Sequence, residues 1–85
     1  MNRGKLLRRL SEGALNNVAF ADMSDLMEGF GFRLARVSGS HHIFVHPAVP
    51  ELVNLQAVAG EAKPYQIRQF LRVVERYNLA LEDDA

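Results

Sequence analysis

The segment that most limits the fold is residues 32–50, because it cannot be helical. The helical periodicity of apolar side chains stops there, and the side chains are β-branched, aromatic or alternately apolar and polar. Ser38-Gly39-Ser40 divides the segment and suits the tight connection of a β-hairpin. Pro47 and Pro50 then exclude a helix, since proline lacks the N–H that a helix interior uses. The segment predicts two antiparallel strands, residues 32–37 and 41–47.

Amphipathic helices are predicted on both sides of this hairpin. Residues 5–10 place leucines at helical spacing beside basic residues, and Gly13 stops that helix. Residues 21–31 predict a second helix, with Asp22 as its N-cap and glycines at its end. The best-patterned helix starts at Pro64, since proline is favourable in a first helical turn. The apolar stripes are Phe20, Met23, Leu26, Met27 and Phe30 in the second helix, and Ile67, Phe70, Leu71 and Val74, with Tyr77 or Asn78, in the last.

A third short strand at residues 52–56 completes the pattern of elements. The order helix, helix, three antiparallel strands, helix predicts an α+β fold, with helices on one face of a small sheet and the other face accessible. At 85 residues the chain is one small domain, residues 1–85. Acidic residues in three of the last four positions predict a solvated, frayed tail over residues 80–85.

The composition excludes several classes of site. There is no cysteine, so disulfides, thiolate metal sites and cysteine nucleophiles are ruled out. The apolar runs are too short to span a bilayer, and the first residues lack the apolar stretch of a secretory signal, so we expect a cytoplasmic protein. The net charge of zero hides a basic body, because residues 1–81 carry 10 basic and 7 acidic side chains, a balance of +3.

All three histidines lie within the second predicted strand. Side chains alternate across a strand, so His41 and Ile43 share one face. His42, Phe44 and His46 share the other, and the pattern alone does not say which face is buried. On a strand His42 and His46 lie too far apart to hold zinc, and we expect no metal. From the residues alone, His41 is either a half-buried strand residue bonded to backbone or water, or a functional group.

Several motifs in the chain resemble the HicA family of toxins from bacterial and archaeal toxin–antitoxin modules. They are Gly31-Phe32, the run GSHHIF at 39–44 and His46-Pro47, followed by a polar loop and a closing amphipathic helix. The resemblance covers about residues 22–79, with Gly39-Ser40-His41 as its most specific part. It implies a fold like that of a double-stranded-RNA-binding domain and the activity of a small endoribonuclease that cleaves mRNA. Residues 1–20 are then an N-terminal helical extension of this core.

By position, the resemblance assigns the family's essential histidine to His41, and the turn that presents it to Gly39 and Ser40. An imidazole can take a proton from an RNA 2′-hydroxyl or give one to the departing 5′-oxygen. Attack of that hydroxyl on its own phosphate needs no metal or other cofactor, and it spares DNA, which lacks the hydroxyl. His42 faces away from His41 and is expected to be structural.

RNA binding requires cations near that strand. Arg68, Arg72 and Arg76 form a stripe on the last helix, which is either a substrate-binding face or a solvated one. Arg33 and Arg36 are expected to point to opposite faces of their strand, so at most one of them shares the face of His41. The predicted RNA-binding residues are Gly39, Ser40, Arg36, Lys63, Arg68 and Arg72.

Two classes of function are consistent with these residues. The first is a toxin endoribonuclease that a cognate HicB-type antitoxin neutralises. The second is a non-catalytic RNA-binding or protein-interaction module on the same fold. Val45 stands where the family often has a basic residue, which lowers the expected affinity for RNA. The presence of Gly39-Ser40-His41 favours the first, because binding alone needs cations and shape rather than a histidine at a turn.

Overall fold

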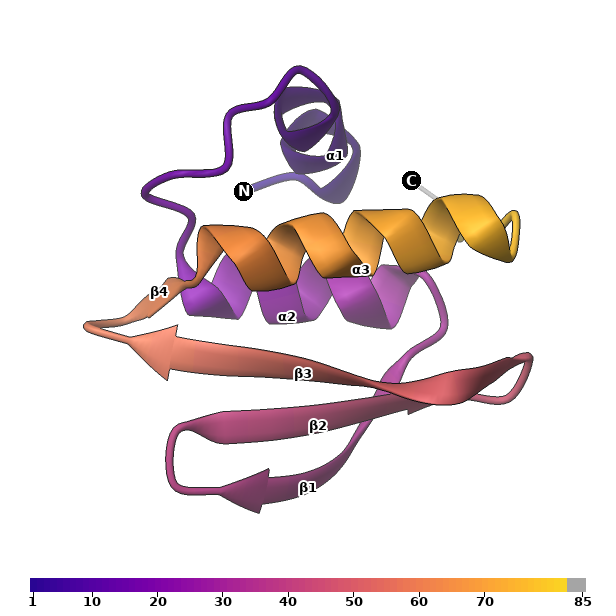
Figure 1. The fold of residues 1–85 in the computed structure, drawn as a ribbon. Coiled ribbons are helices and arrows are strands. Elements are labelled where there is room, and N and C mark those ends of the chain that lie inside the picture. Colours follow the sequence, from indigo (N-terminus) through magenta and orange to yellow (C-terminus); the bar gives the residue numbers. More distant parts are fainter. Residues whose placement is uncertain (83–85) are drawn as a thin grey trace.

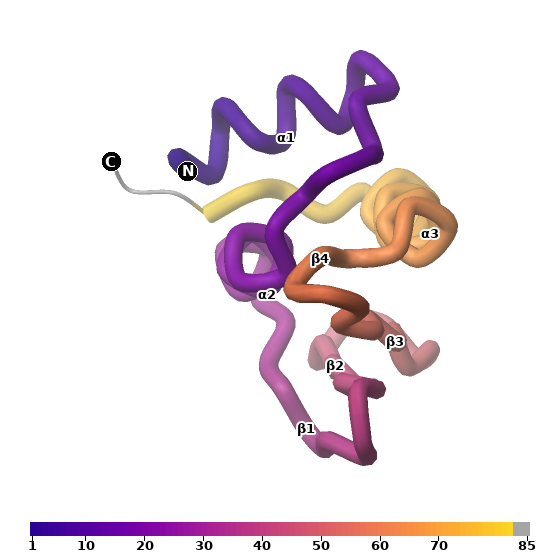
Figure 2. The backbone as a smooth tube through the Cα atoms, turned by 90° about the vertical axis from the view of Figure 1, so that its left-hand side faces the viewer, coloured from indigo at the N-terminus to yellow at the C-terminus, as the bar shows by residue number. Residues whose placement is uncertain are grey.

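The computed structural model describes residues 1–82 and has the α+β architecture that the sequence predicts. Within these residues, three helices lie on one side of a four-stranded antiparallel sheet, with α2 and α3 next to the sheet and α1 beyond them (Figure 1). The perpendicular view again places all the helices on one side of the sheet, with the first helix farthest from it (Figure 2). No helix within residues 1–82 combines the length and the hydropathy needed to cross a membrane.

The helices begin close to the predicted positions, with one exception. α1 (Arg3–Ser11) is capped by Asn2, whose side-chain oxygen accepts a bond from the Lys5 backbone N–H at 3.0 Å. α3 (Pro64–Arg76) starts at the predicted proline. α2 (Phe20–Gly29) starts before Asp22, so the prediction of Asp22 as N-cap is wrong. The Phe20 N–H at the start of α2 donates instead to the carbonyl of Gly60, a distant backbone group that replaces a side-chain cap.

The sheet has the order β1-β2-β3-β4, and its strands are β1 (Arg33–Ser38), β2 (His41–His46), β3 (Val49–Val58) and β4 (Glu61–Ala62). The predicted count of three strands is therefore one too few, because β4 is a two-residue strand in a segment expected to be loop. β3 is also longer than predicted. It accommodates Pro50 because its register with β2 shifts between Val49 and Val53, so the missing N–H breaks no regular ladder bond.

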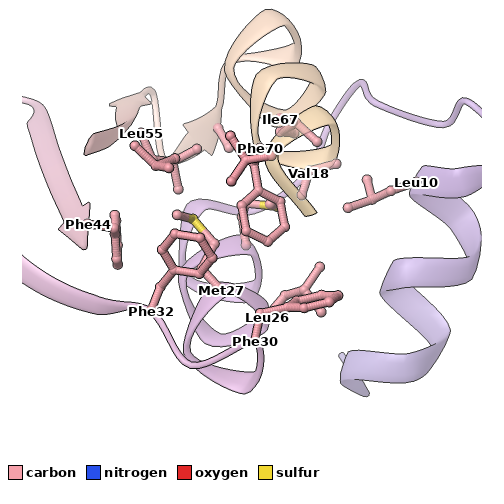
Figure 3. Close-up of a cluster of buried hydrophobic side chains, with 14 of the residues drawn as sticks. Leu10, Val18, Leu26, Met27, Phe30, Phe32, Phe44, Leu55, Ile67 and Phe70 are labelled. Carbon is pink, nitrogen blue, oxygen red and sulfur yellow. The ribbon is translucent and has the colours of Figure 1, made fainter. Parts of the chain in front are cut away.

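The apolar core fills the space between the two layers (Figure 3). Phe70 of α3 meets the rings of Phe30 and Phe32, each with ring centroids 5.5 Å apart, in edge-to-face contacts. Phe44 of β2 reaches the same core from the sheet, and Leu10 of α1 reaches it from the other side. Truncating Phe70 to alanine would remove about 3–5 kcal/mol of stability. α1 thus belongs to the packed body, although it precedes the residues that carry the resemblance.

Two ion pairs fix α1 onto α2. The N-terminal ammonium lies 3.1 Å from the carboxylate of Asp22. The guanidinium of Arg3 makes two bonds, of 2.9 and 3.0 Å, to the carboxylate of Asp25. Hydrogen bonding to Arg3 is the main reason that the pKa of Asp25 is lowered from its usual 3.8.

The end of the described chain is docked rather than frayed. Leu81 is half-buried, and the Glu82 N–H donates to the carbonyl of Gly29 at 2.8 Å. The described part of the predicted tail is thus held at residues 81–82 and is not frayed there, although Ala80 and Glu82 are exposed as a solvated tail requires. The rest of the predicted acidic tail, residues 83–85, lies outside the described residues.

Candidate active site

The turn between β1 and β2 has the geometry that its sequence predicts. Ser38 pairs with His41, so Gly39 and Ser40 form the whole connection. Gly39 has φ of +61°, the left-handed conformation that the first central position of a type II′ turn requires. A Cβ at this position would meet no atom within 4 Å, so backbone conformation rather than space selects glycine. The turn holds the first residue of β2, His41, at one end of the sheet.

Ser40 is fixed by three hydrogen bonds to neighbouring strands. Its carbonyl accepts the Ala57 N–H at 3.1 Å and the His42 Nδ1–H at 3.0 Å. Its hydroxyl oxygen accepts a bond from Nε2 of Gln56 at 3.1 Å. Because these bonds come from both β2 and β3, they limit the movement of the turn. The hydroxyl proton of Ser40 remains available as a donor.

His41 lies on the face of the sheet that the helices leave uncovered. The strand register places Ile43, Asn54 and Gln56 on the same side, and we call this side the open face. His41 is exposed, and its Nδ1 lies 3.2 Å from Nδ2 of Asn54. Within residues 1–82 its Nε2 makes no hydrogen bond, so this nitrogen can exchange a proton with a ligand on the open face.

The other two histidines face the helices, as the strand alternation predicts. The ring of His42 packs against Phe20 with centroids 4.5 Å apart, and that of His46 against Phe32 at 5.0 Å. His46 also bonds backbone at both nitrogens. Its Nε2–H donates to the Phe30 carbonyl at 3.1 Å, and its Nδ1 accepts the Ala48 N–H at 3.0 Å. These contacts give His42 and His46 structural roles.

The arginines of β1 both lie on the open face, so the prediction that they point to opposite faces is wrong. Arg33 pairs with Val45 and Arg36 with Ile43, two residues on one side of β2. A β-bulge between Leu34 and Arg36 inserts Ala35 and thereby reverses the alternation after it. The predicted RNA-binding residue Arg36 consequently lies on the face of His41, with its cross-strand partner Ile43 two positions from that histidine.

The basic stripe of α3 is divided between the two ends of the sheet, because α3 runs antiparallel to β3. At the end that carries His41, the Gln56 N–H of β3 donates to Oε1 of Gln66 at 2.6 Å. At the other end Arg76 binds the carboxylate of Glu51 at 2.5 Å. The start of α3 and the turn between β1 and β2 accordingly lie at the same end of the molecule (Figure 1).

The predicted cations of this region therefore lie at different distances along the helix from His41. Lys63 immediately precedes α3, and its Nζ lies 5.8 Å from the centre of the Tyr65 ring. Arg68 is exposed one turn further on. Arg72 lines a groove of about 240 Å³ between α3 and the start of β3, together with Leu52 of the open face. None of these three cations has an acidic partner within residues 1–82.

Three polar residues of the site are not found by reading the sequence. Asn54 and Gln56 come next to His41 and Ser40 only through the pairing of β2 with β3. Gln66 is 2% exposed within the amphipathic helix α3, where it satisfies a backbone N–H at the edge of β3. In the sequence these are ordinary polar residues of a strand and a helix. The described residues 1–82 contain no group of three or more histidine or acidic side chains placed to hold a metal ion.

A comparison of the sequence with models of known protein families gave a match. A family model described as the HicA toxin of bacterial toxin–antitoxin matches residues 20–75 of the 85. The chain belongs to the HicA toxin family. The match runs from the start of α2 almost to the end of α3, so it includes the turn, His41 and Asn54. Neither the comparison with curated proteins nor that with solved structures gave a significant match.

Membership of the HicA family confirms the resemblance found in the sequence motifs. The fold, with helices on one face of an antiparallel sheet, agrees with it. α1 lies outside the matched region. It packs against α2 and α3 on the side that faces away from the sheet (Figure 2). The family is one of toxins, so the partner expected for this chain is an antitoxin.

Proposed function

We propose that this HicA-family protein is an mRNA-cleaving endoribonuclease that works without a metal, with His41 as its general acid/base. The observation that carries the proposal is the placement of His41. It is an exposed imidazole at a rigid hairpin turn, on a sheet face that no helix covers, with Nε2 directed to solvent rather than to a protein group. A histidine that only supported the fold would be expected to resemble His46, which is bonded at both nitrogens.

The proposed reaction is attack of an RNA 2′-oxygen on the adjacent phosphorus. Nε2 of His41 takes the proton of the 2′-hydroxyl while the bond from the 2′-oxygen to phosphorus forms. The bond from phosphorus to the 5′-oxygen breaks, and that oxygen takes a proton from water or from the imidazolium. The upstream fragment then ends in a 2′,3′-cyclic phosphate. One general acid/base group supplies about 10²–10⁴-fold rate enhancement, which corresponds to a slow nuclease.

RNA is proposed to lie across the open face, with its phosphates near cations from two elements. Arg36 approaches from β1, while Lys63, Arg68 and Arg72 approach from the side of α3. The Ser40 hydroxyl and the backbone at Gly39 would contact the phosphate beside His41, since the turn is fixed and carries no bulky side chain. The absence of acidic partners for these cations supports this arrangement within residues 1–82.

A HicB-type antitoxin is proposed to inhibit the enzyme in the cytoplasm by covering this same face. β1 supports such an interface, since all six of its residues are exposed and its outer edge is unpaired in the sheet order. A partner that covers His41 and Arg36 would block both proton transfer and phosphate binding.

The proposed function is tested with a defined RNA oligonucleotide and the purified chain. We expect cleavage to persist in excess chelator and to give a 2′,3′-cyclic phosphate, because the nucleophile is part of the substrate. A matched oligonucleotide with one 2′-deoxy sugar at the cut site should bind equally well and remain intact. Cleavage of that strand, or activity that chelator removes and a divalent ion restores, would refute the mechanism. Binding without any cleavage would identify the chain as a non-catalytic module.

A further inference from the structure

We infer that Asn54 is a positioning residue for His41: its side-chain amide bonds Nδ1, orients the imidazole and sets its tautomer, while Nε2 stays directed to solvent. The inference rests on the proposed function, because it assigns a role within the same site. It adds a residue of β3 to a site in which the sequence motif supplies only residues of the turn and β2.

The strand register brings these two side chains together. His41 pairs with Gln56, and Ile43 pairs with Asn54, so Asn54 is the diagonal neighbour of His41 on the open face. Its amide nitrogen lies 3.2 Å from Nδ1 of the ring. Asn54 is half-buried, whereas His41 is exposed, so the less mobile partner is the asparagine. The contact therefore restrains the imidazole from its Nδ1 edge and leaves the Nε2 edge toward solvent.

The amide oxygen of Asn54 explains how this contact can affect the tautomer of His41. Within residues 1–82 its Oδ1 is buried and has no hydrogen-bond partner, so no second bond ties the amide to one orientation. A half-turn of the amide about the Cβ–Cγ bond exchanges Oδ1 and Nδ2, which are nearly equal in size. Oδ1 then lies next to Nδ1 of His41, where it accepts the ring N–H. The same side chain can thus bond the ring as a donor or as an acceptor.

These two orientations correspond to two states of the imidazole. When the amide N–H donates to Nδ1, the neutral ring carries its proton on Nε2 and cannot act as a base there. When Oδ1 accepts from Nδ1–H, the lone pair is on Nε2, and the bond persists after Nε2 takes a proton. We assign the second orientation to the reactive state. A neutral amide makes this bond without the strong bias toward the imidazolium that a carboxylate would impose.

The charged groups around His41 define how its titration should respond. On the open face the neighbouring strand β1 brings Arg33 and Arg36, while β3 brings only the neutral Asn54 and Gln56. At the same end of the sheet, Glu61 lies on β4 and Lys63 precedes α3. Replacing Asn54 with aspartate would therefore place a carboxylate in direct contact with Nδ1 of His41.

The experiment compares the parent chain with Asn54→Ala and Asn54→Asp, and with Asn16→Ala as a matched control in an exposed loop. Nitrogen-15 NMR of the histidine ring, in free protein without RNA, reports the tautomer and the pKa of His41. We expect the parent and Asn16→Ala to share one tautomer preference, and Asn54→Ala to lose it. Asn54→Asp should raise the pKa of His41, because a carboxylate beside the ring stabilises the imidazolium.

Cleavage kinetics give the second readout. We expect Asn54→Ala to lower kcat by about 10-fold to 100-fold with little change in KM, because the ring is no longer held in the reactive geometry. Asn54→Asp should keep more activity than Asn54→Ala and shift the acid limb of the pH profile to higher pH.

Unchanged tautomer and titration in both variants would overturn the inference, whatever the activity. Should the NMR changes occur in a chain that cleaves no RNA, the contact would stand and the proposed function would fail. If Asn54→Ala unfolds, the nearly isosteric Asn54→Asp variant still tests the contact.

Discussion

The two faces of β2 use the same residue type for different purposes. On the face toward the helices, His46 is bonded at both nitrogens and packs against Phe32. On the open face, His41 is exposed and contacts the protein through Nδ1. Both lie in one six-residue strand, so the difference comes from the side of the sheet rather than from the local sequence.

A histidine is available for proton transfer when its surroundings leave one ring nitrogen without a hydrogen bond. A ring with both nitrogens bonded to backbone groups is a structural cross-link, because a change in its protonation would break one of those bonds. A ring restrained at one nitrogen only is oriented and can still exchange a proton.

His41→Ala should remove cleavage activity and leave the fold intact. We expect kcat/KM to fall by about 10²–10⁴-fold, the contribution of one general acid/base group. The melting temperature should change little, because the side chain is exposed. The control is His42→Ala, one position along the same strand, which should lower stability more than it lowers cleavage. Parental activity in His41→Ala, or its loss only through unfolding seen by circular dichroism, would contradict the assignment.

His46→Ala should give the opposite result on the helix-covered face. The Ala48 N–H and the Phe30 carbonyl both lose their partner, and Phe32 loses a ring contact. The part-buried Phe30 carbonyl destabilises by about 1–3 kcal/mol when it is unsatisfied, whereas water can bond the exposed Ala48 N–H, so we expect a loss of about 2 kcal/mol in the free energy of unfolding. Urea denaturation measures it. Below the unfolding transition, cleavage per folded molecule should remain parental, and a selective loss of activity would remove the contrast between the faces.

The double variant Arg68→Ala/Arg72→Ala should weaken RNA binding without changing the cleavage chemistry. Each phosphate contact to single-stranded RNA contributes about 0.7 to the slope of log affinity against log salt, so the slope should fall by about 1.4. Affinity near 0.1 M salt should drop on the order of 10-fold. Lys5→Ala/Arg8→Ala removes two exposed charges from α1, on the far side of the helices from the sheet, and is the matched control. Equal salt slopes in the two double variants would place the RNA elsewhere.

Asp25→Asn should have the smallest effect, because Asp25 is exposed and only links α1 to α2. Its pKa is lowered in the folded state from the usual 3.8, chiefly by the hydrogen bond to Arg3. The stabilisation is thus present above pH 3.8 and is lost as the pH falls through the lower folded-state value. We expect a slightly lower melting temperature than the parent at pH 7 and no difference well below pH 3.8. A difference that grows on acidification would contradict this sign.

The sequence alone determined the hairpin, the helices and the division of the histidines between two faces. The period of two along a strand separates His41 from His42, and it does so wherever the strand lies in the fold. The turn is also local, because a two-residue connection with φ of +61° at its first position favours glycine at position 39. The apolar stripe of α3 likewise follows from a spacing of three and four residues.

Only the tertiary structure decided which face is open and what surrounds His41. The bulge at Ala35, which places Arg33 and Arg36 on one side, depends on how β1 pairs with β2. The contact between Asn54 and His41 depends on the register of two strands, and β4 pairs not only with the nearby end of β3 but also with the distant backbone of Val18 and Ala19. Local periodicity contains no information about register, because pairing energy arises between segments that meet only when the chain has folded.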